Sequence, residues 1–309
     1  MPILAHGEHY FGRRGFPVTV RRVDSGQPGA SHPHDVTELE HYHDFSELVI
    51  VAGGHGQHRL EGQSFPISGG DVFVLQGRQV HCFRERVQLQ LINVMYDPTR
   101  LALPTRLLRR ISGYSALFML EPAFRQAHRF SSRLHLNRSD LGAAEALVRQ
   151  IERESAARGE GHEAVLLSLL LQLMTFLSRR YGHSRDTEAR SLLRVGQLIG
   201  TLERDYTQAW SIEQLTAMTH LSRSSLIRTF RKATGQSPID YLIRRRIEAA
   251  MRALQQTEQS VTEVALDCGF ADSNYFARQF RQICGCTPSD FRQRARATGP
   301  EQLLSANLS

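Results

Sequence analysis

Three histidines and one glutamate in the first third of the chain are residue types that bind polar ligands or metal ions. His41, His43 and Glu47 stand in the stretch HYHDFSE, and His81 follows the run DVFVLQG. Because side chains alternate along a strand, His41 and His43 are expected to point to the same face. The four side chains are therefore candidates for a single site.

Three interpretations of this cluster remain open. The spacing H-x-H-x-x-x-E with a later histidine is the ligand pattern of metal-binding cupin barrels, which hold an iron, manganese or nickel ion. The same side chains can instead donate and accept hydrogen bonds with the hydroxyl groups of a sugar inside a barrel mouth. They can also be structural histidines at a barrel rim.

A second group of candidates belongs to a unit that occurs twice in the last third of the chain. In each copy a serine, Ser211 or Ser260, precedes a short helix, and a tight turn leads into a second helix with apolar residues four apart. Each copy ends with a glycine, followed by a proline that opens the next helix, as at typical helix boundaries. These pairs are Gly235 with Pro238 and Gly285 with Pro288.

Two short helices joined by a tight turn predict a helix-turn-helix, whose second helix can enter the major groove of DNA. Off the apolar stripe, both second helices carry side chains that read bases or bind phosphates. These candidates are Arg223, Ser224, Ser225, Arg228 and Lys232 in the first copy and Ser273, Asn274, Arg278 and Arg281 in the second. Ordinary helical hairpins with solvated basic faces are the alternative, and the matching caps and stops of the two copies argue against it.

The segment between the two copies, residues 238–257, predicts one helix that would span about 30 Å. Successive major-groove faces of B-DNA lie about 34 Å apart. We therefore expect this helix to hold two recognition helices over adjacent grooves of one duplex.

The histidines must be positioned by the segment 40–96, where short alternating runs between Gly-rich turns predict a small β-barrel or sandwich. SELVIVAGG and GQHRLEG are expected to be separate strands. Two helices follow, one capped by Ser139 and one over 162–181. The broad apolar stripe of the second helix, which includes Leu170, fits a dimer interface or core packing against the β-domain, and we expect the interface.

Charge and composition describe a globular protein with a polyanionic partner. The net charge is +7 and the sequence pI is about 9.6, and Lys232 is the single lysine among 38 basic residues. The four cysteines lack the spacing of a metal site, which favours reduced thiols in the cytoplasm. The N-terminus lacks the apolar core of a signal peptide, and the apolar run from Ala164 is too short to span a membrane. We expect a cytoplasmic protein that does not bind a membrane.

Residues 191–296 resemble the DNA-binding domain of the AraC/XylS family, in the stretches LSRSSLIRTFRKATGQSP and GFADSNYFARQFRQICGCTP. The resemblance implies that the base-facing residues are Arg223, Ser224, Arg228, Ser273, Asn274 and Arg278. Ser224 departs from the pattern, because some relatives carry a larger side chain there. The resemblance further implies a homodimer that binds repeated half-sites in double-stranded promoter DNA and contacts RNA polymerase.

Residues 40–103 are similar to the sensor half of the L-rhamnose operon activators of this family. This likeness implies a monosaccharide effector, L-rhamnose or a related deoxy sugar, bound near His41, His43, Glu47 and His81. On this basis we favour the sugar pocket and expect no cofactor, no metal ligand and no catalytic residue. The alternative is a metal-binding cupin sensor, or a cupin enzyme, fused to the DNA-binding domain.

The sequence therefore predicts an α+β protein: a cupin-like β-barrel with a helical dimerisation segment, then an all-α domain with two helix-turn-helix motifs joined by a linker helix. The expected function is an activator of a carbohydrate-catabolism operon. The expected boundaries are 1–135 for the effector domain, 136–181 for the dimerisation segment, 182–190 for a linker, 191–297 for the DNA-binding domain and 298–309 for a tail.

Overall fold

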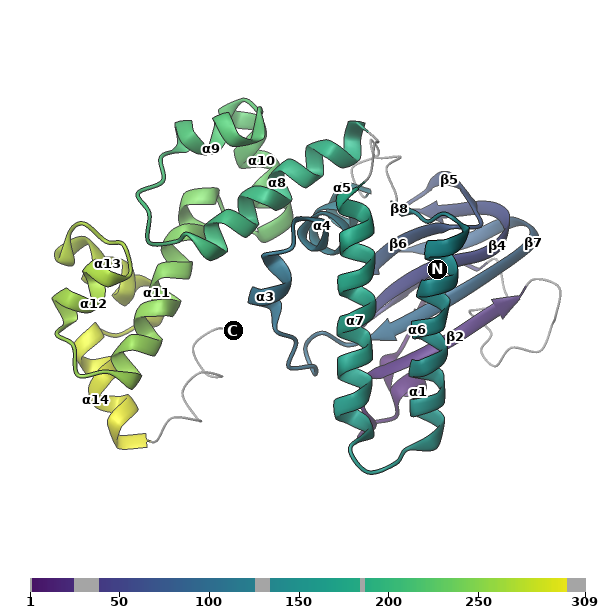
Figure 1. Cartoon of the computed structure of the whole chain (residues 1–309), viewed down its shortest axis with the longest axis horizontal. Coiled ribbons are helices and arrows are strands. Elements are labelled where there is room, and N and C mark those ends of the chain that lie inside the picture. Colours follow the sequence, from purple (N-terminus) through teal and green to yellow (C-terminus); the bar gives the residue numbers. More distant parts are fainter. Residues whose placement is uncertain (1, 25–38, 126–133, 184–186, 299–309) are drawn as a thin grey trace. The chain divides into compact units, whose positions relative to one another are not determined.

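The computed structural model describes residues 2–24, 39–125, 134–183 and 187–298. The chain divides into two compact units, Met1–Gln197 and Leu198–Ser309. The first unit is a β-sheet with helices and the second is entirely helical in its described part (Figure 1). This confirms the predicted α+β class, while the predicted tail lies outside the described residues except for Thr298.

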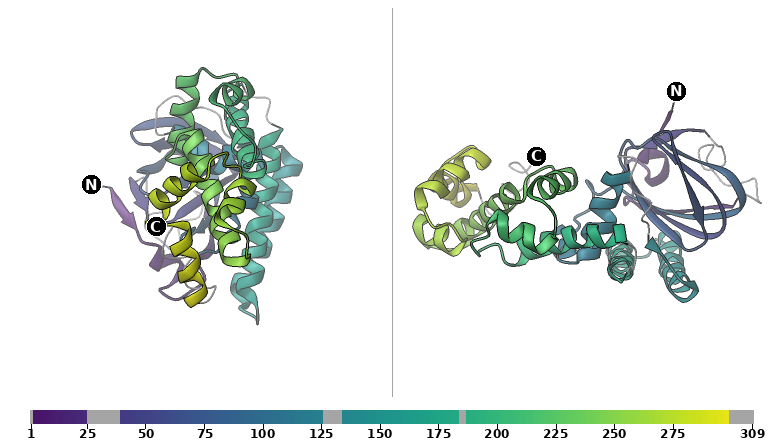
Figure 2. Two further views of the ribbon diagram at one scale, coloured as in Figure 1. Left: turned by 90° about the vertical axis from the view of Figure 1, so that its left-hand side faces the viewer. Right: turned by 90° about the horizontal axis from the view of Figure 1, so that it is seen from above.

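Among the described residues of the first unit, eight strands form one sheet. They are β1 (Ile3–Ala5), β2 (Val18–Asp24), β3 (His41–His43), β4 (Ser46–Leu60), β5 (Gln63–Ser68), β6 (Asp71–Gln76), β7 (His81–Tyr96) and β8 (Leu134–His135). The strand order is β1-β3-β7-β4-β6-β8, with β2 added on β7 and β5 on β4. Seen from above, the sheet curls into a barrel, as predicted (right-hand view of Figure 2).

The long strand β4 corrects the prediction of two separate strands. SELVIVAGG and the first five residues of GQHRLEG belong to one strand that pairs with β7, and Glu61 and Gly62 form the turn after it. Its register against β7 shifts between Val51 and Gln57, so the glycines mark a bulge instead of a turn. Gly54 has φ +70°, and a Cβ atom there would lie 2.1 Å from the carbonyl oxygen of Gln88, so only glycine fits this bulge.

The interior of the barrel is apolar over most of its length. A buried cluster from β2, β4, β5, β6 and β7 fills it, and Phe73, Leu75 and Leu91 are among its members. Glu47 lies on β4 two and four residues before Val49 and Val51 of this cluster, and alternation therefore turns its side chain inward as well. One carboxylate thus stands at the edge of an apolar interior.

Helices pack on the outside of the sheet. The long helices α6 (Arg138–Ala157) and α7 (His162–Gly182) lie side by side next to β2 (Figure 1). The N-cap of α6 is Asn137, whose side chain accepts a hydrogen bond from the Asp140 backbone N–H at 2.9 Å. The predicted cap, Ser139, lies inside the first turn of α6, because the asparagine two residues earlier offers the same acceptor first.

A group of short helices supports the strand turn that leads into His81. The short helices of the first unit include α1 (Gly7–Phe11), α3 (Thr105–Arg109), α4 (Ser112–Tyr114), the π-helix η1 (Ser115–Leu120) and α5 (Glu121–Arg125). The Gln79 side chain donates a hydrogen bond to the carbonyl oxygen of Pro122 at 3.1 Å, and the Gln76 side chain donates to that of Phe118. Phe118 of η1 and Pro122 of α5 therefore fix the β6–β7 turn through their backbone carbonyls.

Helix α8 (Thr187–Arg204) begins inside the range expected to be a linker and continues past the boundary between the two units. Gly196 of this helix packs against α4, since a Cβ atom there would lie 2.3 Å from the Ser112 carbonyl oxygen. At the other end of α8, Glu203 forms a buried ion pair with Arg245 at 3.0 Å and accepts a hydrogen bond from the Tyr241 hydroxyl. Both partners lie on α11, so α8 is anchored within the second unit.

The second unit contains the two predicted helix-turn-helix motifs. Its helices are α9 (Ile212–Thr219), α10 (Arg223–Thr234), α11 (Pro238–Gln256), α12 (Val261–Asp267), α13 (Ser273–Cys284) and α14 (Pro288–Thr298). Ser211 and Ser260 form capping boxes with Gln214 and Glu263, which confirms both predicted caps. Gly235 ends α10 in the left-handed conformation, and Gly285 ends α13 in the same way.

Two apolar side chains of the second motif point outward. Leu266 is 57% exposed and Tyr275 is 37% exposed, whereas Phe276 and Phe280 are fully buried against α11 and α14. Adjacent helical residues lie about 100° apart, so Tyr275 and Phe276 cannot both face the core. The buried cluster that contains Phe270, Phe276, Phe280 and Phe291 forms the core of this motif, and Tyr275 is not part of it.

Candidate effector site and DNA-binding surface

The four predicted effector residues come together at the end of the barrel where Glu47 stands. Glu47 Oε2 lies 3.3 Å from His43 Nε2 and 3.7 Å from His81 Nε2. The rings of His41 and His81 are 4.3 Å apart, centroid to centroid. The expected alternation is confirmed, since His41 and His43 both reach His81 from β3.

Backbone pairing explains how residues so distant in sequence meet. His41 of β3 is the register partner of His81 in β7, and β4 carries Leu60 as the partner of His81 on the other side. Each ring is then oriented through Nδ1. His43 Nδ1 lies 2.8 Å from the carbonyl oxygen of Phe45, and His81 Nδ1 lies 3.2 Å from that of Gln79.

The cluster is almost sealed from solvent. His43, Glu47 and His81 are 1–3% exposed, and His41, at 8%, is the most accessible of the four. Burial lowers the pKa of His81 well below its ordinary value, and the neighbouring His41 and His43 lower it further. His81 is therefore a neutral imidazole at neutral pH, able to accept at Nε2.

A fifth histidine, His58, also belongs to this region and was not singled out from the sequence. It is fully buried on β4, its ring stacked between Phe73 and Phe83 at 4.7 and 4.9 Å, and it lies 5.8 Å from the His81 ring. The sequence pattern did not indicate His58, because this residue follows the β4 bulge and the bulge changes which residues face inward.

The first recognition helix, α10, presents most of its predicted residues to solvent. Arg223, Ser224, Arg228 and Lys232 are exposed. Ser225 is half-buried, and its hydroxyl accepts a hydrogen bond from that of Ser222, the N-cap residue, at 3.0 Å. The arginines and Lys232 are accordingly better placed for DNA than Ser225. Desolvation lowers the pKa of Lys232 from its ordinary value.

The second recognition helix, α13, has the same layout. Asn274, Arg278 and Arg281 are exposed, and Ser273 is half-buried in the first turn. Asp272 caps this turn by accepting from the Asn274 backbone N–H at 2.7 Å, which leaves the Asn274 side chain outward. The Arg278 guanidinium lies 5.9 Å from the Tyr275 ring centroid. Tyr275 is thus a surface residue of this helix that sequence reasoning missed.

Comparisons with known proteins agree with both halves of this description. The sequence profile of the AraC-like ligand binding domain matches residues 29–174, and that of a helix-turn-helix domain matches residues 215–294. The HTH-type transcriptional activator RhaR of Enterobacter sp. (strain 638) is 31% identical over 91% of this chain and 99% of its own length. The chain belongs to the AraC family of transcriptional regulators. The activator RhaS of Escherichia fergusonii is 33% identical over 82% of this chain and 87% of its own length.

As an AraC-family member, the protein is a DNA-binding transcriptional activator with a ligand-binding domain, and it is not an enzyme. The alternative of a cupin enzyme fused to the DNA-binding domain is therefore wrong. None of the described helices of this AraC-family chain combines the length and apolar character needed to cross a membrane.

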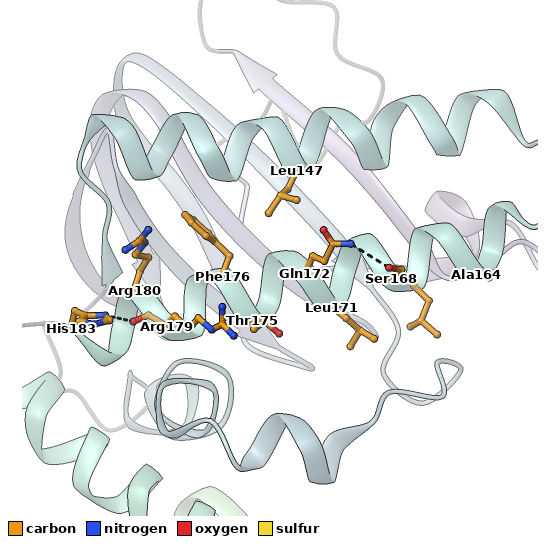
Figure 3. Close-up of a pocket in the computed structure, with 11 residues that line it drawn as sticks. Leu147, Ala164, Ser168, Leu171, Gln172, Thr175, Phe176, Arg179, Arg180 and His183 are labelled. Atoms are coloured by element: carbon orange, nitrogen blue, oxygen red, sulfur yellow. Dashed lines mark hydrogen bonds between the residues drawn. The ribbon is translucent and has the colours of Figure 1, made fainter.

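The stripe on α7 that suggested a dimer interface is largely core in this AraC-family protein. Leu166, Leu170, Leu173, Met174 and Leu177 are at most 2% exposed within a single chain. Core packing, the alternative interpretation, therefore holds for these residues. A different face of α7, together with Leu147 of α6, lines a groove of about 830 Å³ (Figure 3). Its apolar lining includes Leu167, Leu171 and Phe176.

Proposed function

We propose that this activator responds to a monosaccharide, L-rhamnose or a related deoxy sugar, and controls a carbohydrate-catabolism operon. The cluster of His41, Glu47 and His81 supports the proposal, because a carboxylate and imidazoles at one end of an apolar barrel suit a polyhydroxylated ligand. About a third of the residues are identical to those of the activators RhaR and RhaS, which favours a related effector. The sugar enters from the side of His41, the most accessible of the four residues.

On the DNA side, we propose that Arg223, Ser224, Arg228, Asn274 and Arg278 face bases. Arginine pairs bidentately with guanine and asparagine with adenine. Lys232, Arg281, Ser225 and Ser273 then contact phosphates, which fix position without reading sequence. The protein acts as a cytoplasmic homodimer on repeated half-sites and contacts RNA polymerase. The groove between α6 and α7 receives the second copy, since its apolar lining would be covered in a dimer.

The sugar shifts the protein toward one arrangement of its domains, which requires a higher affinity for that arrangement than for the other. The decisive test is a thermal-shift panel on the full chain with L-rhamnose, L-mannose, L-fucose and L-arabinose. A ligand that binds the native state raises the midpoint, and the shift grows with the logarithm of its concentration above Kd. L-Rhamnose and L-mannose differ only at C6, so they test whether a deoxy position is recognised.

A matched pair of variants tests whether the sugar binds inside the barrel. His41→Gln should abolish the shift, while His55→Gln, an exposed histidine on β4, should leave it unchanged. No shift with any sugar would reject the proposed effector class. A shift that survives in the His41 variant would move the sugar to another site.

A further inference from the structure

We propose that His43, Glu47 and His81 form a binding site for a divalent first-row transition metal ion within the effector domain. Each residue offers one ligand atom, and the three atoms lie within 4.8 Å of one another. Two imidazoles and one carboxylate with further positions open is the donor set of non-haem Fe²⁺ sites, and imidazole also suits Ni²⁺ and Zn²⁺.

The hydrogen bonds behind the rings point the ligand atoms inward. A carbonyl oxygen can only accept, so the Nδ1 atoms facing Phe45 and Gln79 carry the protons. In the neutral imidazole the lone pair is then on Nε2, which is the atom directed at Glu47 in both histidines. Metal-ligating histidines are oriented in this way by backbone carbonyls.

The inward atoms lack the hydrogen bonds that burial demands. The Nε2 atoms of His43 and His81 are fully buried and have no hydrogen-bond partner. Two lone pairs and a carboxylate that face one another repel, and such a group is costly inside an apolar barrel. A divalent cation between them satisfies all three atoms at once.

The distances from Glu47 to the two histidines require little movement on binding. Ligand atoms about 2.1 Å from a metal ion lie about 3 Å apart when they are adjacent in its coordination sphere. The two distances to Glu47, 3.3 and 3.7 Å, are close to this value. Packing holds the frame, since the His43 ring stacks on Phe45 at 4.5 Å with an interplanar angle of 14°.

The metal site adds a ligand-binding group to the proposed function. Its contact with the sugar rests on that function, because it requires that the sugar binds in this barrel. His41, the residue from whose side we propose that the sugar enters, lies beside His81, with the ring centroids 4.3 Å apart. Hydroxyl oxygens are suitable ligands for the coordination positions that the protein leaves open. The sugar would therefore coordinate the ion instead of forming hydrogen bonds with the three side chains directly. Metal binding by itself needs no sugar and is measured without one.

The test uses the full chain without a histidine tag, because a tag would bind the same ions. The protein is stripped with dipicolinate, dialysed separately against Fe²⁺ under nitrogen, Ni²⁺ and Zn²⁺, passed through a desalting column and analysed by elemental mass spectrometry. We expect about one equivalent of at least one of these ions per chain. Glu47→Gln, which keeps the shape and removes the charge, should reduce the retained metal at least tenfold. His55→Gln should retain as much metal as the parent.

A second measurement covers the case in which Glu47→Gln fails to fold. X-ray absorption on the reloaded parent protein should show a shell of nitrogen and oxygen atoms with the multiple scattering of two imidazoles. Retention of less than about a tenth of an equivalent, or equal retention in a folded Glu47→Gln variant, would overturn the metal site. In either case a sugar-dependent thermal shift would still support the proposed function, so the two proposals fail separately.

Discussion

His41 and His81 face each other across one antiparallel strand pair, and their ring centroids lie 4.3 Å apart. The strand that carries His41 is only three residues long and pairs on its other side with β1 near the N-terminus. The geometry of the candidate effector site therefore depends on how well β3 is held between β1 and β7. Substitutions in β1 are expected to act on effector affinity without touching the effector.

Replacing Arg278 with alanine tests the base-reading role of α13. The exposed guanidinium is in a position to pair with a guanine, so its loss should cost about 1–3 kcal/mol on the preferred operator and relax one base position. Binding is measured by fluorescence anisotropy on a library of single-base operator variants at fixed salt. Arg153→Ala, an exposed arginine on α6, is the control and should not change DNA binding. Equal weakening on every sequence would make Arg278 a phosphate contact.

Tyr275 should act through Arg278. Its exposed ring lies within cation–π range of the guanidinium and restricts where the arginine can point. Tyr275→Ala is expected to weaken operator binding by about 0.5–1 kcal/mol, at the same base position as Arg278→Ala. A double-mutant cycle measures the coupling. If the two losses add, Tyr275 contacts DNA on its own account and does not orient Arg278.

Gly269 in the turn of the second motif should not tolerate a side chain. Its φ is +89°, and a Cβ atom there would lie 2.4 Å from the carbonyl oxygen of Thr207. Gly269→Ala is expected to lower the free energy of unfolding by more than about 1 kcal/mol, from strain and overlap together. Chemical denaturation measures this loss. Gly142→Ala, where a Cβ atom meets nothing within 4 Å, should be neutral or slightly stabilising. Equal effects of the two substitutions would contradict this account of the turn.

Two adjacent leucines of α7 should behave differently on substitution with aspartate. Leu170 is fully buried within the chain, so Leu170→Asp should unfold the effector domain, at a cost above about 3 kcal/mol. Leu171 lines the groove between α6 and α7, so Leu171→Asp should leave the fold intact and give monomers. Circular dichroism and sedimentation separate the outcomes. A folded Leu171→Asp dimer would remove this groove from consideration as the dimer interface.

The cysteines of the second unit should make stability fall at high pH. Burial raises the pKa of Cys268 and of Cys284 from 9.0 to about 11 each. Because the folded state favours the neutral thiol, this contribution is present below pH 9 and is lost between about pH 9 and about pH 11. Urea denaturation from pH 8 to pH 10.5 measures the decline. The double variant Cys268→Ala, Cys284→Ala should show a shallower decline, and an unchanged slope would assign the effect to other groups.

The sequence predicted the DNA-binding unit most completely. Caps such as Ser211 and Ser260 and stops such as Gly235 and Gly285 act within a few residues, so local chemistry was sufficient to place the helices. What it did not reveal was which of two adjacent aromatics turns inward. That choice between Tyr275 and Phe276 depends on the neighbouring helices α11 and α14, which local spacing does not describe.

In the effector domain, the sequence indicated four residues of the cluster but not His58, which lies beside His81. Alternation was enough to group His41 with His43, because no bulge interrupts β3. His58 was missed since the register shift in β4 lies between Val51 and Gln57 and changes which residues face the interior. The role of Leu170 was undecidable from its spacing, because core helices and interface helices carry the same apolar stripe. Only the position of α7 against the sheet distinguishes them.

Helix α11 packs against both recognition helices, α10 and α13, and spans about 28 Å over its 19 residues. A single residue inserted in it would rotate one recognition helix about 100° relative to the other. If both recognition helices read bases, as proposed, the length of α11 fixes their angular relationship around the duplex. On the proposed base contacts, we expect single base-pair changes in the operator to be tolerated better than a change of one base pair in the spacing within a half-site. We therefore expect substitutions on α10 and α13 to change specificity, and insertions in α11 to abolish operator binding.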